Sequence, residues 1–265
     1  MSAGTERFDL SGRVAIVTGG GSGIGKATAR LLARRGADVA IAGRRAEKLE
    51  VAAEQIRGES GQRCLAVATD VRKPEDCLAL METVAHEFGH IDILINNAGG
   101  ARAHVGLSKI EPRFWDRDVE LNLSAAQYCS QAAFPHLKKS KGCIVNVSSL
   151  AGIHGTQGVG AYSAAKAGLQ MYTRVASAEW GPAGIRVNCV ACGMIATENA
   201  LASWDKTGFD AMASCQAFPL KRYGEMGEAA EAIVFMASDA SSYITGETLT
   251  VGGGPQIGGM VSIEE

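Results

Sequence analysis

Apolar residues along this chain fall into two alternating patterns, one typical of strands and one typical of helices. Short runs rich in β-branched residues predict strands over residues 14–18, 38–42, 64–69, 91–95, 143–148, 185–191 and 248–251. Longer stretches with apolar residues three and four apart predict helices over residues 24–35 and 46–57, and near 74–88, 113–137, 161–180 and 227–237. Strand and helix therefore follow each other in turn along most of the chain.

The predicted strands are apolar at nearly every position rather than at alternate positions, as in CIVNV at residues 143–147. Strands of this kind have both faces covered, as in a parallel sheet between two layers of helices. We expect one doubly wound α/β (Rossmann-type) parallel sheet of about seven strands, forming a single domain over residues 1–265. Residues 194–219 look irregular and are too many for an ordinary connection, so we expect a substrate lid there.

The composition narrows the class of protein and its partners. A chain of 265 residues, 46% of them apolar, can form a large core without disulfides or metals. A formal net charge of -2 gives no overall attraction to nucleic acid or to an anionic membrane, so neither is an expected partner. Seven cysteines without a regular framework, and an N-terminus without an apolar stretch, favour a cytoplasmic protein with free thiols.

The first predicted strand leads into a glycine-rich turn, TGGGSGIG at residues 18–25, which opens the first long helix. Glycines here let the backbone turn sharply and approach a pyrophosphate, while the start of the helix supplies N–H groups and a positive dipole end. A glycine-rich turn that binds nothing is the alternative, and the position directly after a strand disfavours it. The expected contacts with a dinucleotide are Gly19, Gly21, Ser22, Gly23, Ile24 and Gly25.

The second predicted strand runs into Gly43-Arg44-Arg45, where a chain that selects NAD would carry an acidic residue for the ribose hydroxyls. One arginine can form two hydrogen bonds with a 2′-phosphate and another can lie over the adenine ring, so the pair predicts NADP(H). Two solvated arginines at the start of a helix are the alternative. Asp70 and Val71, after the third strand, are expected at the adenine edge, although aspartate is also common in turns.

Tyr162 and Lys166 lie four apart on a predicted helix and share one face, and Ser149 follows the fifth strand. A free tyrosine titrates near 10, so an acid/base working near neutral pH needs a shift worth roughly 3 to 4 kcal/mol. One ammonium at about 4 Å, in an effective dielectric of about 20, supplies on the order of 4 kcal/mol. We therefore predict Tyr162 as an acid/base tuned by Lys166, with Ser149 donating to the substrate oxygen. A tyrosine and a lysine at this spacing are otherwise more often a surface pair.

Together these motifs resemble the short-chain dehydrogenase/reductase family over nearly the whole chain. The matching motifs are TGGGSGIG (18–25), Asp70-Val71, NNAG (96–99), Asn122 in ELNLS, VSS ending at Ser149, and YSAAK (162–166). The resemblance implies hydride transfer between a nicotinamide and a carbonyl or secondary alcohol. It makes Tyr162 the acid/base, Ser149 the substrate anchor and Lys166 a binder of the nicotinamide ribose. It also implies a water held by Asn122, and cofactor contacts from Asn97, Ala98 and Gly99.

The chain departs from the family pattern after the strand RVNCVA, where Cys192-Gly193 replaces the usual Pro-Gly. Losing proline removes a fixed backbone angle, and we expect the nicotinamide contacts of Ile195 and Thr197 to persist in a less constrained loop. The change also creates a Cys-X-X-Cys pair with Cys189. No second pair and no neighbouring histidine supports zinc, so we predict no metal or redox role there.

The substrate is the least defined part of the prediction. Met194 and Trp204 in the expected lid would cover a lipophilic substrate, and Gly193 and His154 are expected to face the same cleft. A helix that packs on the domain or on another subunit is an equal alternative for the lid, and a loop histidine is more often incidental than catalytic.

The resemblance leaves two alternatives open for the activity. It extends to 3-oxoacyl thioester reductases and to dienoyl-CoA reductases, which implies an acyl-thioester substrate, with reduction of a C=C bond as the alternative reaction. A cofactor-binding protein without catalysis is a further alternative. By analogy with the family, we expect a homotetramer or homodimer formed through the helices near 113–137 and 161–180.

Overall fold

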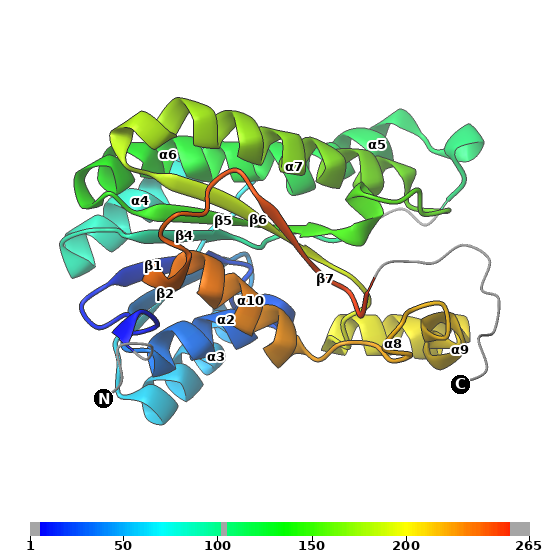
Figure 1. The fold of residues 1–265 in the computed structure, drawn as a ribbon, viewed down its shortest axis with the longest axis horizontal. Coiled ribbons are helices and arrows are strands. Elements are labelled where there is room, and N and C mark those ends of the chain that lie inside the picture. The colour runs from blue at the N-terminus through cyan, green and yellow to red at the C-terminus, as the bar shows by residue number, and fades with distance from the viewer. Residues whose placement is uncertain (1–5, 102–104, 255–265) are drawn as a thin grey trace.

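The computed structural model describes residues 6–101 and 105–254, which form a central sheet between two layers of helices (Figure 1). The seven strands are β1 (Val14–Thr18), β2 (Asp38–Gly43), β3 (Cys64–Ala68), β4 (Ile93–Asn96), β5 (Cys143–Ser149), β6 (Arg186–Cys192) and β7 (Thr248–Val251). All neighbouring strands pair in parallel, in the order β3-β2-β1-β4-β5-β6-β7. The predicted doubly wound α/β sheet is confirmed.

Three helices cover each face of the sheet, and the remaining helices lie at one end of it. The helices α2 (Gly23–Arg34), α3 (Ala46–Ser60) and α10 (Met226–Ala237) lie on one face, and α4 (Pro74–Phe88), α6 (Ala125–Ser140) and α7 (Gly160–Trp180) lie on the other (Figure 1). The shorter helices are α5 (Pro112–Val119), α8 (Glu198–Thr207) and α9 (Ala211–Cys215). The short 3-10 turns are η1 (Leu107–Lys109), η3 (Leu150–Gly152), η4 (Gly181–Ala183) and η5 (Asp239–Ser241).

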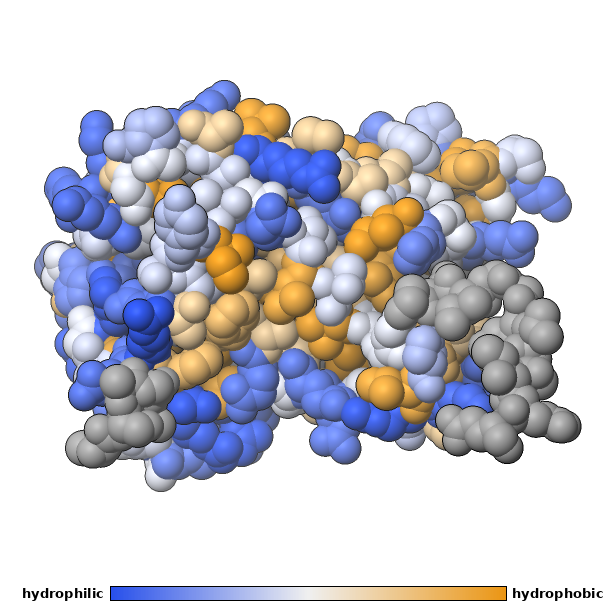
Figure 2. All heavy atoms as spheres, viewed as in Figure 1, coloured by the Kyte–Doolittle hydropathy of each residue, from blue (hydrophilic) through white to orange (hydrophobic). Residues whose placement is uncertain are grey.

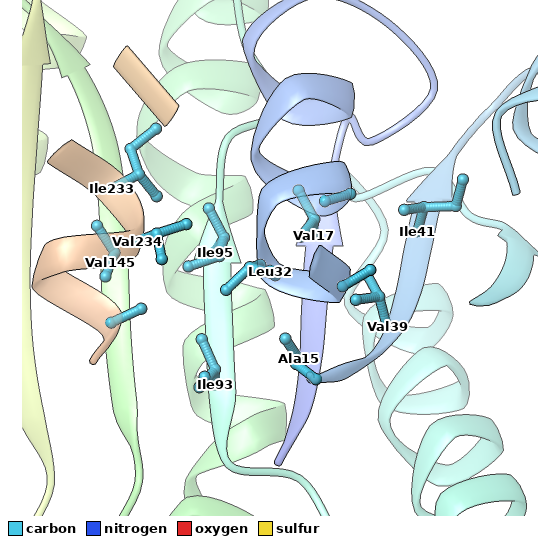
Figure 3. Packing of buried hydrophobic residues seen from close by; sticks show 14 of the residues in the cluster. Ala15, Val17, Leu32, Val39, Ile41, Ile93, Ile95, Val145, Ile233 and Val234 are labelled. Atoms are coloured by element: carbon cyan, nitrogen blue, oxygen red, sulfur yellow. The ribbon is translucent and has the colours of Figure 1, made fainter. Parts of the chain in front are cut away.

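The five inner strands are buried on both faces because each face packs against its own helices, whereas the edge strands β3 and β7 are only partly buried. On one face, Ile233 and Val234 of α10 and Leu32 of α2 pack against strand side chains that include Val145 and Ile95 (Figure 3). A second apolar cluster fills the space between the other face and α4, α6 and α7. Burial of this kind stabilises the fold by about 25 cal/mol for each Å² of apolar surface removed from water. It explains the apolar runs that predicted the strands.

Two features differ from the elements expected from the sequence. The helix expected near 113–137 is interrupted by a π-helical segment, η2 (Glu120–Ser124), which joins α5 to α6. Residues 194–219 are not irregular, because they contain α8 and α9, whose N-caps Thr197 and Asp210 accept hydrogen bonds from Ala200 N and Ala213 N. Neither helix belongs to the two helical layers that cover the sheet (Figure 1).

The topology gathers loops from distant parts of the chain at one edge of the sheet. The strand order reverses between β1 and β4, and in sheets of this kind ligands bind at that switch point, beyond the carboxyl ends of the strands. Thr18, Asn96, Ser149 and Cys192 are the last residues of β1, β4, β5 and β6. Among the described residues, no helix combines the length and the apolar character needed to cross a membrane.

Candidate active site

The glycine-rich turn lies between β1 and α2 and is packed closely against the end of β4. Gly19 and Gly23 adopt positive φ angles of 68° and 56°, which glycine adopts at little cost. A Cβ atom on Gly19 would lie 2.8 Å from Asn97 Nδ2, and one on Gly25 would overlap the carbonyl of Gly19. Because Ser22 provides no side-chain cap for α2, the turn is a cradle of backbone N–H groups that suits a pyrophosphate.

A glutamate from a distant helix also contacts this cradle. The N–H of Gly23 donates to Oε2 of Glu198 over 3.1 Å, although the two residues are 175 positions apart. Glu198 is the first residue of α8 and is exposed to solvent. Sequence reasoning missed this contact, because nothing local to either residue links α8 to the start of α2.

Thr18 ties the end of β1 to the NNAG motif. Its Oγ1 accepts hydrogen bonds from the N–H groups of Asn97 and Ala98, both over 3.0 Å, and donates to the carbonyl of Ile95. The Nδ2 group of Asn97 donates to the carbonyl of Thr18 over 2.9 Å. The predicted cofactor residues Asn97 and Ala98 are thereby held beside the cradle.

The predicted adenosine end of the site carries three arginines rather than two. Arg44 and Arg45 follow β2 directly and are exposed, with Arg45 at the N-cap of α3. The carboxylate of Asp70 accepts from Nε of Arg72 over 2.9 Å and from a second guanidinium nitrogen. These bonds lower the pKa of Asp70 to about 2, and the charge of Arg44 adds to the effect.

Arg72 was missed in the sequence, because an arginine just after a strand is ordinarily a solvated residue. The carboxylate of Asp70, which is expected at the adenine edge, binds this guanidinium. Val71 is buried beside it. Asp70 is therefore ionised at neutral pH and orients a basic residue at the edge where the adenosine is expected.

Ser149, Tyr162 and Lys166 are brought together where β5 ends and α7 begins. The side chains of Ser149 and Tyr162 are hydrogen-bonded to each other. Oγ of Ser149 also accepts from the N–H of Ala151 over 3.1 Å. The ammonium of Lys166 donates to the carbonyl of Val147 over 2.7 Å and lies 5.8 Å from the centroid of the Tyr162 ring.

The start of α7 is fixed to the end of β5 by further hydrogen bonds. Oγ of Ser148 donates to the carbonyl of Lys166 over 3.0 Å, and Nε2 of Gln170 donates to Ser148 Oγ over 3.1 Å. Because these bonds join successive turns of α7 to one strand, they hold the Tyr162 and Lys166 side chains at a fixed distance from Ser149.

Burial changes the pKa values of both titratable groups. The pKa of Tyr162 is raised, because burial outweighs the hydrogen bond from Ser149, which lowers it. This direction is opposite to the downward shift that the sequence argument attributed to Lys166. Burial lowers the pKa of Lys166 itself from 10.5 to about 8, so its charge is expensive to keep. The negative charge of Asp118, a fully buried residue, also raises the pKa of Tyr162.

Asn122 lies in the π-helical segment and faces the same site. Its Nδ2 donates to the carbonyl of Asp118 over 2.9 Å, and its Oδ1 accepts from the N–H of Gly100 over 2.8 Å. A Cβ atom on Gly99 would lie 2.7 Å from Asn122 Oδ1 and 3.2 Å from Lys166 Nζ. The structure therefore brings Asn122, Gly99 and Lys166 into one group.

The loop after β6 is held in place despite the absence of proline. The N–H of Gly193 donates to the carbonyl of Val251, and Gly224 exchanges hydrogen bonds with Met194 and Ala196 through its N–H and carbonyl. Ile195 is buried, and Thr197 caps α8. The expected loosening of this segment is offset by these bonds to the chain around β7 and α10.

Cys192 is buried beside Lys166 and Tyr162, and burial raises the pKa of its thiol to about 12. Cys189 is buried as well and its thiol pKa is raised to about 11. Both are therefore neutral at physiological pH, and all seven cysteines are free. Within residues 6–101 and 105–254, no group of three potential ligands could hold a metal ion.

The structure places the residues predicted for the substrate on different elements. His154 follows η3 and is exposed, and Trp204 lies on α8, where its ring packs against Phe209 and Tyr223 at centroid distances of 6.3 and 5.7 Å. These rings line a cavity of about 370 Å³ together with Leu201 and Met212. Trp204 thus belongs to an aromatic group formed by the lid and Tyr223 rather than to the group around Tyr162.

The chain is similar to known proteins over most of its length. A family model described as enoyl-(acyl carrier protein) reductase matches residues 19–256. Cis-4-hydroxycyclohexanecarboxylate dehydrogenase of Sinomonas cyclohexanicum is 43% identical over 91% of this chain and 96% of its own. Peroxisomal 2,4-dienoyl-CoA reductase of Danio rerio is 38% identical over 92% of this chain and 82% of its own.

Solved structures also have a similar fold. L-sorbose reductase of Gluconobacter frateurii, solved with NADPH and L-sorbose, has a TM-score of 0.90 and 30% identity, covering 94% of this chain and 98% of its own. The family model covers the cradle from Gly19 onward and the group formed by Ser149, Tyr162 and Lys166. The chain belongs to the short-chain dehydrogenase/reductase family of oxidoreductases.

Proposed function

We propose that the protein is an NADP(H)-dependent oxidoreductase that interconverts a carbonyl and a secondary alcohol. The observation that carries this proposal is the fixed group of Ser149, Tyr162 and Lys166 at the carboxyl edge of the sheet, joined through Gly99 to the strand that supports the cradle. A binding protein without catalysis would have no need for this arrangement.

Each residue of the site has a separate role at the substrate oxygen. NADP(H), when bound, supplies or accepts the hydride. Tyr162 transfers the proton to or from the substrate oxygen through its hydroxyl, and Ser149 donates a hydrogen bond to the same oxygen. Lys166 favours the ionised form of Tyr162 when its own ammonium is charged. As the resemblance to the family implies, Asn122 holds a water that links Lys166 to solvent.

The cradle fits a pyrophosphate because its glycines allow close approach to the backbone N–H groups. Gly19 and Gly25 leave no room for a Cβ atom, and the first turn of α2 supplies N–H groups without a side-chain cap. Gly21, Ser22, Gly23 and Ile24 complete the turn. Asn97 and Ala98, together with Ile195 and Thr197, are the proposed contacts nearer the nicotinamide.

Selectivity for NADP(H) rests on the basic group at the adenosine end. Arg44 and Arg45 are exposed and free to bind a 2′-phosphate, and Arg72 adds a third positive charge beside them. No acidic residue stands at 43–45 to bind ribose hydroxyls. The L-sorbose reductase structure, with its NADPH, supports the same choice.

A lipophilic or acyl-thioester substrate is the proposed class. Exposed apolar side chains of the lid, Leu201, Phe209 and Met212, are available to cover it, and Leu107 and Ile153 are exposed on the segments before α5 and after β5. Gly193, Met194, His154 and Trp204 remain the proposed substrate contacts. The lid is proposed to be residues 194–219 of a single domain.

Reduction of an activated C=C bond is the second candidate. It is favoured by the similarity to the 2,4-dienoyl-CoA reductase and by the description of the matching family model. The Ser149 and Tyr162 pair favours the first reaction, because both hydroxyls suit an oxygen atom better than an alkene carbon. Product analysis from a 3-oxoacyl thioester and from an enoyl thioester separates the two.

The test of the reaction is replacement of Tyr162 by phenylalanine. We expect kcat to fall at least a thousandfold, while the Kd for NADPH changes less than threefold, because only the hydroxyl is removed. NADPH oxidation would be followed at 340 nm with a panel of ketones, steroids and acyl thioesters. Tyr172→Phe, on the same helix, is the matched control. Retained turnover in Tyr162→Phe would refute the assignment.

The test of cofactor selectivity is the double replacement Arg44→Ala and Arg45→Ala. We expect the Kd for NADPH to rise ten- to a hundredfold, with less than a threefold change for NADH, because only NADPH carries the 2′-phosphate. Arg34→Ala and Arg35→Ala, at the far end of α2, remove the same charge away from the site. Equal weakening of both cofactors would contradict this proposal.

The proposed assembly is a homotetramer or homodimer in a reducing cytoplasm. Met171 and Val175, four apart on α7, are 55% and 48% exposed, which suits a helix that packs on another subunit. Apolar side chains also gather across the middle of the face seen in Figure 2, over β7 at the edge of the sheet. Seven free cysteines agree with a reducing compartment.

A further inference from the structure

The contact between Glu198 and Gly23 joins the lid to the cofactor cradle. Oε2 of Glu198 accepts from the N–H of Gly23 over 3.1 Å. A Cβ atom on Gly23 would lie 3.5 Å from Cγ2 of Thr197 and 3.9 Å from the same Glu198 oxygen, so both residues lie against the turn. The first residue of α8 thus meets the first residue of α2.

This contact places a negative charge where the helix attracts one. The first turn of α2 contains no acidic residue, and the side chain of Ser22 does not cap it. The N–H groups and the dipole of a helix N-terminus stabilise a nearby anion. Glu198 supplies that anion from another element. The pyrophosphate of a dinucleotide would bind at the same end of α2, and two anions held there would repel each other.

The attachment of α8 to the rest of the protein depends on few contacts. None of the ten residues of α8 is buried, so little apolar burial holds this helix in place. Thr197 accepts from Ala200 N over 3.1 Å and fixes the first turn of α8 directly behind Glu198. Displacement of the Glu198 carboxylate therefore removes one of the specific bonds between the lid helix and the domain.

We propose that Glu198 competes with the cofactor pyrophosphate for the N-terminus of α2 and thereby sets the affinity for the dinucleotide. The carboxylate holds α8 against the cradle in the free protein, and cofactor binding displaces it. Lid position and cofactor occupancy are thus linked through one side chain. The inference rests on the proposed dinucleotide function, and it is independent of the choice between NADP and NAD and of the reaction catalysed.

The test compares three variants by calorimetric titration. Glu198→Gln keeps a hydrogen-bond acceptor and loses the charge, Glu198→Ala loses both, and Glu75→Gln removes one exposed charge from the first turn of α4 as a control. For both Glu198 variants, we expect the Kd for NADPH to fall about two- to fivefold, the range that a charge at a helix end provides. Glu75→Gln leaves it unchanged.

Titrations with two further ligands show whether the change in Kd depends on the pyrophosphate. The Kd for NADH falls by the same factor, since NADH carries the same pyrophosphate. The Kd for adenosine 2′-monophosphate, which has none, stays unchanged. Circular dichroism checks that every variant is folded.

Other results overturn the proposal. Weaker NADPH binding by Glu198→Ala would make the side chain a support of the cradle, and an unchanged Kd in both variants would remove it from cofactor binding. An equal change for adenosine 2′-monophosphate would place the effect outside the pyrophosphate site. If the unmodified protein binds neither NADPH nor NADH, both this inference and the proposed function fail, whereas normal binding with no effect of Glu198 overturns the inference alone.

Discussion

Replacement of Lys166 by methionine should make the protein more stable while removing its activity. The Lys166 side chain is 4% exposed, and burial lowers the pKa of its ammonium from 10.5 to about 8. The folded protein thus binds this proton less tightly than the unfolded chain does. A difference of about 2.5 between the two pKa values corresponds to about 3 kcal/mol of instability while the lysine is charged in both states.

The pH dependence gives this prediction its sign. Below pH 8 both states hold the proton, so the folded state carries the whole penalty. Between pH 8 and 10.5 the unfolded chain binds more protons, so the Lys166 contribution to stability improves as pH rises. At pH 9.5 less than half of that penalty remains. Methionine has a similar length and no charge, although it leaves the Val147 carbonyl without its donor, at a cost of about 1 kcal/mol.

The free energy of unfolding would be measured by urea titration at pH 7 and pH 9.5, without cofactor and at equal protein concentrations. Lys166→Met should be about 2 kcal/mol more stable than the unmodified protein at pH 7 and nearly equal to it at pH 9.5. Comparing the two proteins at each pH cancels the titration of the cysteines and of Tyr162. A difference that stays constant or grows with pH would refute the idea that the charge of Lys166 opposes folding.

Two other changes test the packing around the site. Thr18→Val removes the Oγ1 that accepts from Asn97 N and Ala98 N, so the free energy of unfolding in urea should fall by about 2 to 4 kcal/mol; a loss below 1 kcal/mol would contradict the role of this hydroxyl. Cys192 has its pKa raised from 9.0 to about 12, so its contribution to stability is present below pH 9 and is lost as pH rises toward 12. Between pH 7 and pH 10, the free energy of unfolding should therefore fall by about 1 kcal/mol less in Cys192→Ala than in the unmodified protein. If both proteins lose the same free energy of unfolding over this range, Cys192 makes no such contribution.

The sheet and its outer helices could be predicted because their signals are local. Strand β1 was predicted with the right bounds, since a strand buried on both faces must be apolar throughout. The bounds of β7 were also right, although this edge strand is only partly buried. The catalytic group was also predictable in outline, because Tyr162 and Lys166 share a helix face and Ser149 ends the strand beside it. The spacing of these residues along the chain is therefore enough to predict that they lie together.

The missed features depend on contacts between distant segments or on weak local patterns. The helix α8 buries no residue and was not predicted, although Thr197 and Asp210 are residue types that start helices and could have indicated α8 and α9. The contact from Glu198 to Gly23 joins positions that only the fold brings together. The raised pKa of Tyr162 follows from burial, which spacing alone does not report.

The π-helical segment at Glu120–Ser124 also determines what a one-residue deletion between α5 and α6 would do. Each residue turns an α-helix by about 100°, so a π turn absorbs one extra residue without rotating the helix beyond it. Deleting one residue between Asp118 and Asn122 would therefore restore a regular helix while leaving the faces of α5 and α6 in their present phase. The change would be confined to the segment itself, where Asn122 would lose the register in which its Nδ2 donates to the carbonyl of Asp118. The added position thus directs Asn122 at the site without altering how the flanking helices pack.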